Sequence, residues 1–193
     1  MKNSLKRRVI SGSFWNGSGA GAQECVRFLL FITLARLLVP ADFGLLSMVM
    51  VFVGFGRIFS EAGFGPALIQ YEVIDVVHKS SVFWLSVLLG VLVAAVFVIC
   101  SSFLASFYSN RSVEMVAIIL SVNFVLRTFV VVPEALLRRQ LEFRRLAICK
   151  FCAMIVSGVA AVTMALLGTG VWSLVAYILA NSGCVAIFLW VAS

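Results

Sequence analysis

The chain has 193 residues, of which 63% are hydrophobic and 12% are charged, and its net charge is +7. About a quarter of the residues of a soluble domain are charged, so this composition excludes a soluble protein and predicts a polytopic membrane protein. Most basic residues lie between apolar segments, where membrane topology accounts for them, so the charge does not indicate nucleic-acid binding. The five cysteines all lie in apolar segments and predict neither a disulfide framework nor a metal site.

The N-terminal segment is basic, as the start of a signal peptide is. Residues 9–19 (VISGSFWNGSG) are too rich in Gly, Ser and Asn for a signal peptide, so we expect an uncleaved, cytoplasmic N-terminus. The first predicted span, residues 13–38, carries Glu24 and Arg27, which can pair at i, i+3. Such a pair either neutralises itself inside the bundle or lines a cavity, and the pattern leaves both interpretations open.

A tight turn, Val39-Pro40-Ala41-Asp42, separates the first span from the second, residues 42–64. Pro40 cannot continue a helix, and Asp42 is a favourable N-cap for the next one. The second span carries Arg57 and Glu61, which share one face of the helix. Ionisable side chains at membrane depth face a protein interior or a watery cavity, so this hairpin predicts a helical bundle around a polar interior.

The third span, residues 81–107, has an uncharged middle that we expect to face lipid. His78 precedes this span and is interpreted as a solvated loop residue. In the fourth span, residues 113–137, Asn123, Arg127 and Glu134 fall close to one helix face, and Pro133 is expected to kink the helix. For Arg127 the sequence leaves open a cavity cation or a structural salt bridge to Glu24 or Glu61.

A basic loop, residues 138–145, precedes the fifth span (146–167), and a minimal turn, Gly168-Thr169-Gly170, precedes the sixth (171–192). The predicted fold is therefore an all-α membrane bundle of about six transmembrane helices in a single domain, residues 1–193. Basic residues concentrate on alternate connections, which predicts that both ends are cytoplasmic. The sixth span ends without a basic flank, so we expect the N-terminal half of a longer transporter.

Five stretches in order resemble one family of bacterial membrane proteins. They are LARLLVPADFGLLSMVMVF (34–52), IFSEAGFGPALIQ (58–70), SSVFWLSVLLG (80–90), VVPEALLRRQLEFRRLA (131–147) and GTGVWSLVAYILA (168–180). They are similar to the O-antigen and exopolysaccharide repeat-unit flippases of the multidrug/oligosaccharidyl-lipid/polysaccharide exporter superfamily. The resemblance covers nearly the whole chain.

The resemblance implies one half of a pseudo-symmetric transporter of the bacterial inner membrane. Such a protein flips an undecaprenyl-diphosphate-linked oligosaccharide by alternating access, without a cofactor and without enzymatic activity. The implied partners are the lipid-linked oligosaccharide, membrane lipids, a second half or a second copy of the chain, and polysaccharide polymerase machinery. The glycan and the source of energy are not predicted.

The candidate substrate-binding residues are Arg27, Arg57 and Arg127, with Glu24 and Glu61 as supporting ion-pair partners. Arg57 follows from its resemblance to a stretch of the related lipid II flippases, and the other two from their place at membrane depth. Two alternatives remain. A truncated or non-transporting assembly subunit is compatible with the sequence, whereas an integral-membrane glycan-lipid transferase would need clustered acid-base residues in a loop, which the sequence lacks.

Overall fold

The computed structural model describes residues 21, 23–60 and 76–192, and these residues form helices joined by short turns. A first helix covers residues 23–37. The helices that follow it are α2 (Pro40–Ser60), α4 (Val76–Phe107), α5 (Arg111–Arg139), α6 (Phe143–Leu166) and α7 (Val171–Ala192). Five helices are long and apolar enough to cross a membrane. The predicted all-α membrane bundle is thus confirmed, while Glu61 and the N-terminal basic residues lie outside the described ranges.

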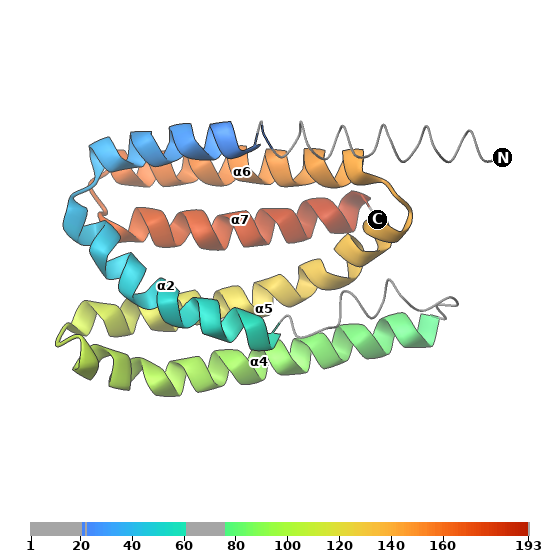
Figure 1. The fold of residues 1–193 in the computed structure, drawn as a ribbon, viewed down its shortest axis with the longest axis horizontal. Helices are drawn as coiled ribbons and strands as arrows, with labels where there is room; N and C mark the ends of the chain where they lie inside the picture. The colour runs from blue at the N-terminus through green and yellow to red at the C-terminus, as the bar shows by residue number, and fades with distance from the viewer. Residues whose placement is uncertain (1–20, 22, 61–75, 193) are drawn as a thin grey trace.

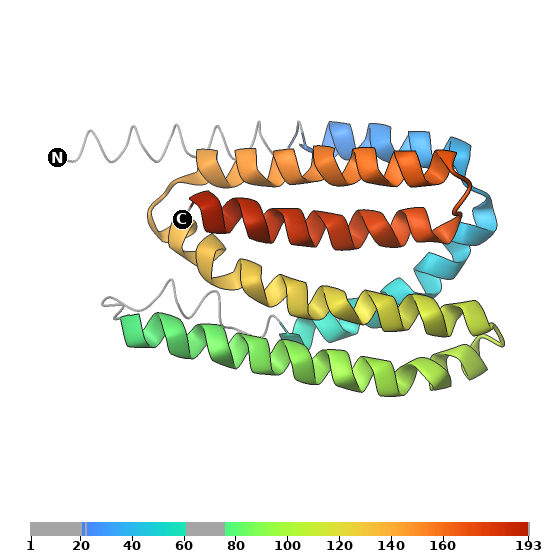
Figure 2. The same ribbon diagram turned by 180° about the vertical axis from the view of Figure 1, so that it is seen from behind.

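From α4 to α7, helices that follow one another along the chain run antiparallel, whereas α5 and α7 run in the same direction (Figures 1 and 2). The largest contacts join α4 to α5 and α6 to α7, and α5 also packs on α7. The first helix lies along α6, and α2 crosses α5 and α4. The basic turn between α5 and α6 lies at the same end of the bundle as the end of α7, as the predicted six-span topology requires.

Three helices end in the same capping motif, which makes the connections tight. Residues Ser109, Leu141 and Gly168 have positive φ angles of 50°, 57° and 74°. In each case the next residue donates its N–H five residues back and the positive-φ residue donates three back, the Schellman pattern. The predicted turn at Gly168 is therefore confirmed, and Leu141 adopts a conformation that normally favours glycine.

The start of α2 differs from the sequence prediction. The helix begins at Pro40 itself, because a proline at the first helical position loses no hydrogen bond. Asp42 therefore lies within the first turn and is not the N-cap that we expected; its carboxylate still favours the positive end of the helix dipole. An added Cβ at Gly170 would lie 3.1 Å from Asp42 Oδ1, so Asp42 also packs against the start of α7.

The start of α4 is a second correction. The helix begins at Val76, and its membrane-crossing part covers Ser81–Phe107, which confirms the bounds of the predicted third span. The backbone of His78, expected in a loop, is helical. The prediction of a loop at His78 is therefore wrong, because the helix starts before the apolar span does.

Glycines allow two helix pairs to approach closely. A Cβ added at Gly90 of α4 would lie 2.3 Å from Thr128 Cγ2 of α5, and one at Gly158 of α6 would lie 2.7 Å from Leu30 Cδ1 of the first helix. Small residues at such contacts are typical of membrane helices, where close packing replaces the hydrophobic driving force.

Pro133 lies inside α5, and the helix continues through it to Arg139. The ribbon turns toward α7 in this region, as predicted (Figure 1). A proline at 133 leaves the carbonyl of Phe129 without its intrahelical donor. Trp190 of α7 donates its Nε1–H to that oxygen at 2.9 Å. The proline's backbone defect is thus satisfied by a side chain from a neighbouring helix, as the membrane interior requires.

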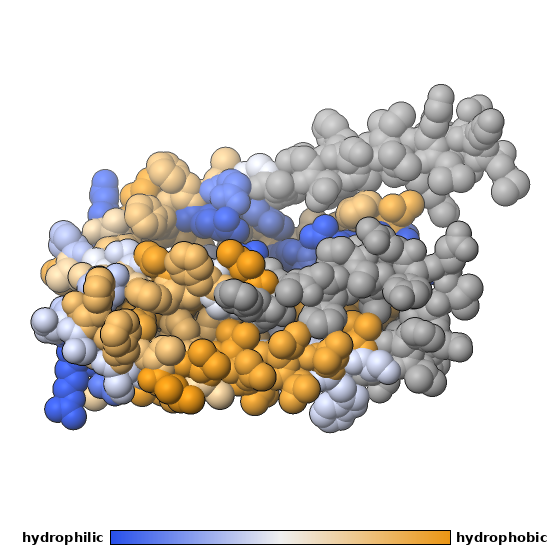
Figure 3. Space-filling model, turned by 60° about the horizontal axis from the view of Figure 1, so that its bottom comes forward, coloured by the Kyte–Doolittle hydropathy of each residue, from blue (hydrophilic) through white to orange (hydrophobic). Residues whose placement is uncertain are grey.

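The outer face of α4 is apolar along its length. Figure 3 shows this side of the molecule as a broad hydrophobic surface. The exposed side chains recur at helical spacing: Leu88, Leu92, Val96, Ile99 and Phe103. These side chains are exposed and apolar, and that they face lipid remains a prediction.

Candidate functional site: a polar cavity between four helices

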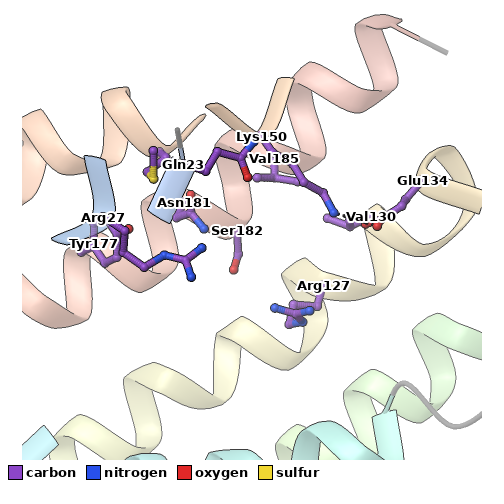
Figure 4. A pocket seen from close by; sticks show the side chains of 11 residues that line it. Gln23, Arg27, Arg127, Val130, Glu134, Lys150, Tyr177, Asn181, Ser182 and Val185 are labelled. Atoms are coloured by element: carbon purple, nitrogen blue, oxygen red, sulfur yellow. Dashed lines mark hydrogen bonds and ion pairs between the residues drawn. The ribbon is translucent and has the colours of Figure 1, made fainter. Parts of the chain in front are cut away.

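A polar cavity of about 220 Å³ lies between the first helix, α5, α6 and α7 (Figure 4). Three of its lining side chains are apolar: Val130, Met154 and Val185. The others are polar or charged: Gln23, Arg27, Arg127, Glu134, Lys150, Tyr177, Asn181 and Ser182. A polar lining inside a bundle with an apolar exterior is costly to bury, so this cavity is the candidate functional site.

Each helix contributes a single stripe to the cavity. The spacing is i, i+4 for Gln23 and Arg27, and i, i+4 for Lys150 and Met154. On α7 the lining residues Tyr177, Asn181 and Val185 follow the same period. Residues at this spacing share one helix face, so the helical repeat alone brings polar groups from four segments to one place.

Positive charge predominates in the cavity. Arg27, Arg127 and Lys150 line it together with one acidic residue, Glu134, among the side chains that the structure describes. Arg27 Nη1 also pairs with Glu24 Oε1 at 2.8 Å, and both side chains are more than half exposed. The predicted Glu24–Arg27 pair is thus confirmed, and it belongs to the cavity rim because Arg27 is a lining residue.

Glu134 is the centre of an ion-pair cluster. Its Oε1 accepts hydrogen bonds from Arg138 Nη2 at 2.7 Å and Nε at 3.0 Å, and from Lys150 Nζ at 2.7 Å. Arg138 is one turn away on α5, whereas Lys150 reaches across from α6. Figure 4 shows the Lys150 side chain directed toward Glu134. The cluster therefore closes the side of the cavity between these two helices.

Hydrogen bonds fix the polar groups around the cavity. Ser182 Oγ donates to Asn123 Oδ1 at 2.6 Å, and both residues are buried. Gln23 Nε2 donates to the carbonyl of Ala147 at 3.1 Å, which ties the first helix to α6. Because buried polar groups without partners are destabilising, these bonds specify how the helices pack.

The structure brings together some of the predicted residues. Arg27 and Arg127 line the same cavity, and Glu134, predicted on the face of Arg127, joins them. Arg57 lies on α2 with an exposed side chain and is not among the lining residues. The roles predicted for Arg57 and for Glu61, which is outside the described residues, remain predictions.

Sequence analysis missed several lining residues. Lys150, Tyr177 and Asn181 were not among the candidate residues. A signal was present, because Tyr177 and Asn181 are polar residues four apart in an otherwise apolar helix. Uncharged polar residues four apart in a membrane helix can therefore also indicate the face that lines a cavity.

A second, apolar groove of about 540 Å³ lies between α2 and α4. It is lined by residues such as Phe52, Leu92 and Phe97. The five cysteines are free thiols in the structure. In the described part of the chain, no three His, Cys, Asp or Glu side chains gather as metal ligands would.

Comparison with known proteins decides the family. The family model described as polysaccharide biosynthesis protein matches residues 33–193. The chain belongs to this family. The matched region includes five of the six described helices, and it contains Arg127, Glu134 and Lys150 of the cavity. The resemblance of its motifs to the polysaccharide flippases is thereby confirmed.

Three curated relatives of the chain also carry names from polysaccharide biosynthesis. The succinoglycan biosynthesis transport protein ExoT of Rhizobium meliloti is 30% identical over 81% of this chain and 32% of its own length. The lipopolysaccharide biosynthesis protein WzxC of Escherichia coli is 24% identical over 79% of this chain and 31% of its own. The teichuronic acid biosynthesis protein TuaB of Bacillus subtilis is 24% identical over 75% of this chain and 30% of its own length. The chain thus spans about a third of these relatives, and no solved structure matches it.

Proposed function

We propose that this chain forms one wall of a transporter that flips an undecaprenyl-diphosphate-linked oligosaccharide across the bacterial inner membrane by alternating access. The observation that carries the proposal is the cavity with three basic side chains and one acidic side chain inside a membrane bundle. Family membership and the transport relative support it. We also propose that the chain has no enzymatic activity and that both of its ends are cytoplasmic.

The physical problem is to move a diphosphate and a sugar through about 30 Å of hydrocarbon. Phosphate charges and sugar hydroxyls cannot be left unpaired in that layer. Arg27 and Arg127 offer guanidinium groups, which bind phosphate through paired hydrogen bonds. Asn181 and Tyr177 lie in the same cavity and suit sugar hydroxyls. The polyprenyl tail stays in the surrounding lipid.

The size of the cavity supports the proposal that a further part contributes to the binding site. Sites for drug-sized ligands usually have about 300–1,000 Å³, and this cavity has about 220 Å³. The chain spans about a third of its curated relatives. We therefore propose that a second half, or a second copy of the chain, completes the binding site, with membrane lipids around it and polymerase machinery as a further partner. Arg57, outside this cavity, remains a proposed third substrate contact.

The test is export of lipid-linked glycan in a strain whose own flippase is deleted. The chain is expressed as it stands and also fused to the remaining two thirds of a relative, and membrane insertion is measured. Surface polysaccharide should return with at least one form. It should be lost with Arg127→Gln or Arg27→Gln but retained with the control Arg111→Gln, because Arg111 begins α5 and does not line the cavity.

Two results contradict the proposal. One is absence of surface polysaccharide with both forms, at normal membrane levels. The other is full export by the Arg127→Gln, Arg27→Gln double variant, which would show that the cavity cations do not contact the substrate. Arg57→Ala, tested in parallel, decides the separate proposal for that residue.

A further inference from the structure

Two cations donate hydrogen bonds to a single carboxylate oxygen of Glu134, and this arrangement suggests a role for the residue. One carboxylate oxygen, Oε1, accepts the three hydrogen bonds described above, two from Arg138 and one from Lys150. Glu134 is the less exposed partner in both pairs, with 21% side-chain exposure against 47% for Arg138 and 33% for Lys150. The carboxylate thus occupies, at the cavity wall, the kind of position between two cations that a phosphate oxygen takes.

We infer that Glu134 is a placeholder for the substrate's diphosphate: it holds Lys150 while the cavity is empty and yields it to the phosphate when the lipid-linked substrate binds. This inference rests on the proposed function and adds Lys150 as a substrate-binding residue and Glu134 as a specificity-determining one. The ligand class is a lipid diphosphate, recognised by its two negative charges. A neutral glycolipid has no group that can compete with a carboxylate for the ammonium.

The two partners of Glu134 are suited to different parts in this exchange. Arg138 lies on the same helix at i, i+4 and binds Oε1 through two nitrogens, so it stays when Lys150 leaves. Glu134 is then still paired, and the penalty for stranding a buried carboxylate does not arise. Lys150 carries a compact charge on a flexible four-carbon stem, which can turn from one oxygen to another within the cavity.

The exchange also explains why an acidic residue is present in a site for an anion. A lysine at membrane depth is unfavourable without a partner, so an empty cavity lined by cations alone would be unstable. Glu134 neutralises one cation in the absence of substrate. It also lowers the affinity for phosphate, because the substrate must compete with it.

The experiment is a calorimetric titration of the purified full chain with inorganic pyrophosphate, in an uncharged detergent at low salt. Glu134→Gln should bind pyrophosphate about two- to fivefold more tightly, since an ion pair of about this exposure no longer competes. The matched control is Glu114→Gln, which removes the same charge from the same helix, where Glu114 accepts from Ser102 Oγ outside the cavity. It should leave the affinity unchanged.

A double-variant cycle separates exchange from a general gain of positive charge. Lys150→Met should weaken pyrophosphate binding, and in that background Glu134→Gln should bring no gain, because there is no lysine to release. If Glu134→Gln alone leaves the affinity unchanged or lowers it, or if its gain persists with Lys150→Met, the exchange is refuted while the proposed cavity stands. If wild-type binding is absent, or is unaffected by Arg27→Gln and Arg127→Gln, this cavity does not hold a diphosphate and the exchange is refuted, while the export assay above decides the proposed function.

A second titration distinguishes the source of the phosphate. Phosphatidylglycerol, a phospholipid with a single phosphate, is added in the same detergent in place of pyrophosphate. We expect weaker binding and a smaller response to Glu134→Gln than with pyrophosphate. An equal response would overturn the assignment to a diphosphate, since the cavity would then accept any lipid phosphate.

Discussion

Gly90 provides a sharp test of how the bundle is packed. It lies where α4 meets α5, and a Cβ at this position would stand 2.3 Å from Thr128 Cγ2 and 3.2 Å from the carbonyl oxygen of Phe124. The first distance is far inside van der Waals contact, and the second limits movement of α4 because a backbone atom cannot turn away. Overpacking of this kind destabilises by about 1–3 kcal/mol. For a chain of this size, about 2 kcal/mol corresponds to a decrease in Tm of about 4–8 °C.

The assay is size-exclusion chromatography of the detergent-solubilised protein after stepwise heating. Gly54→Ala is the matched control, because a Cβ there has no neighbour within 4 Å. The partner change is Thr128→Ser, which removes the clashing methyl group and keeps the hydroxyl that donates to Val125 O at 2.7 Å. Gly90→Ala should lower Tm, Gly54→Ala should not, and adding Thr128→Ser should recover most of the loss. Equal Tm values for wild type and Gly90→Ala would refute the reasoning, as would a loss that Thr128→Ser does not reduce.

Two further predictions concern the backbone. Trp190→Phe should destabilise the folded protein by about 1 kcal/mol, because the Phe129 carbonyl loses its hydrogen-bond donor. Adding Pro133→Ala should remove this loss, because alanine has a backbone N–H for the same carbonyl. The Tm of both variants, measured by stepwise heating, checks this. Leu141→Gly should stabilise the folded protein by about 1 kcal/mol, and Gly168→Ala should destabilise it by about as much, because both positions have positive φ. A Cβ at Gly168 meets nothing within 4 Å, so backbone strain alone would account for the loss. Equal Tm shifts of the same sign for these last two variants would contradict the argument from strain.

The fold was predictable from the sequence because the membrane imposes simple rules. A bilayer requires apolar helices of about 20 residues, so hydropathy alone locates them. The errors lie at helix ends: α2 begins at Pro40 itself, and α4 begins at Val76 and includes His78, because hydropathy locates apolar spans and does not locate the ends of helices. The Pro133 bend was predicted, but its donor Trp190 was not, because the two residues are far apart in sequence and only tertiary packing joins them.

The site was predictable only in part, for a related reason. Arg27 and Arg127 were found because charges in apolar helices are conspicuous. The partner of Glu134 was not, because Lys150 comes from a different helix, and helix periodicity relates residues only within one segment. Sequence alone identifies the faces that are polar, but not which faces meet.

The part of α5 that lines the cavity lies between two separate cores. Val116 and Phe124, in its first half, pack in a core with α2, α4 and the first half of α7, whereas Leu137, near its end, packs in a core with α6 and the second half of α7. Arg127 and Glu134 fall between these anchors, and so does the proline that interrupts the backbone ladder. A helix held at both ends by different cores can change shape most easily at the break between them. Arg127 and Glu134 therefore lie at the break in α5, where a change in the shape of this helix would change the distance between them.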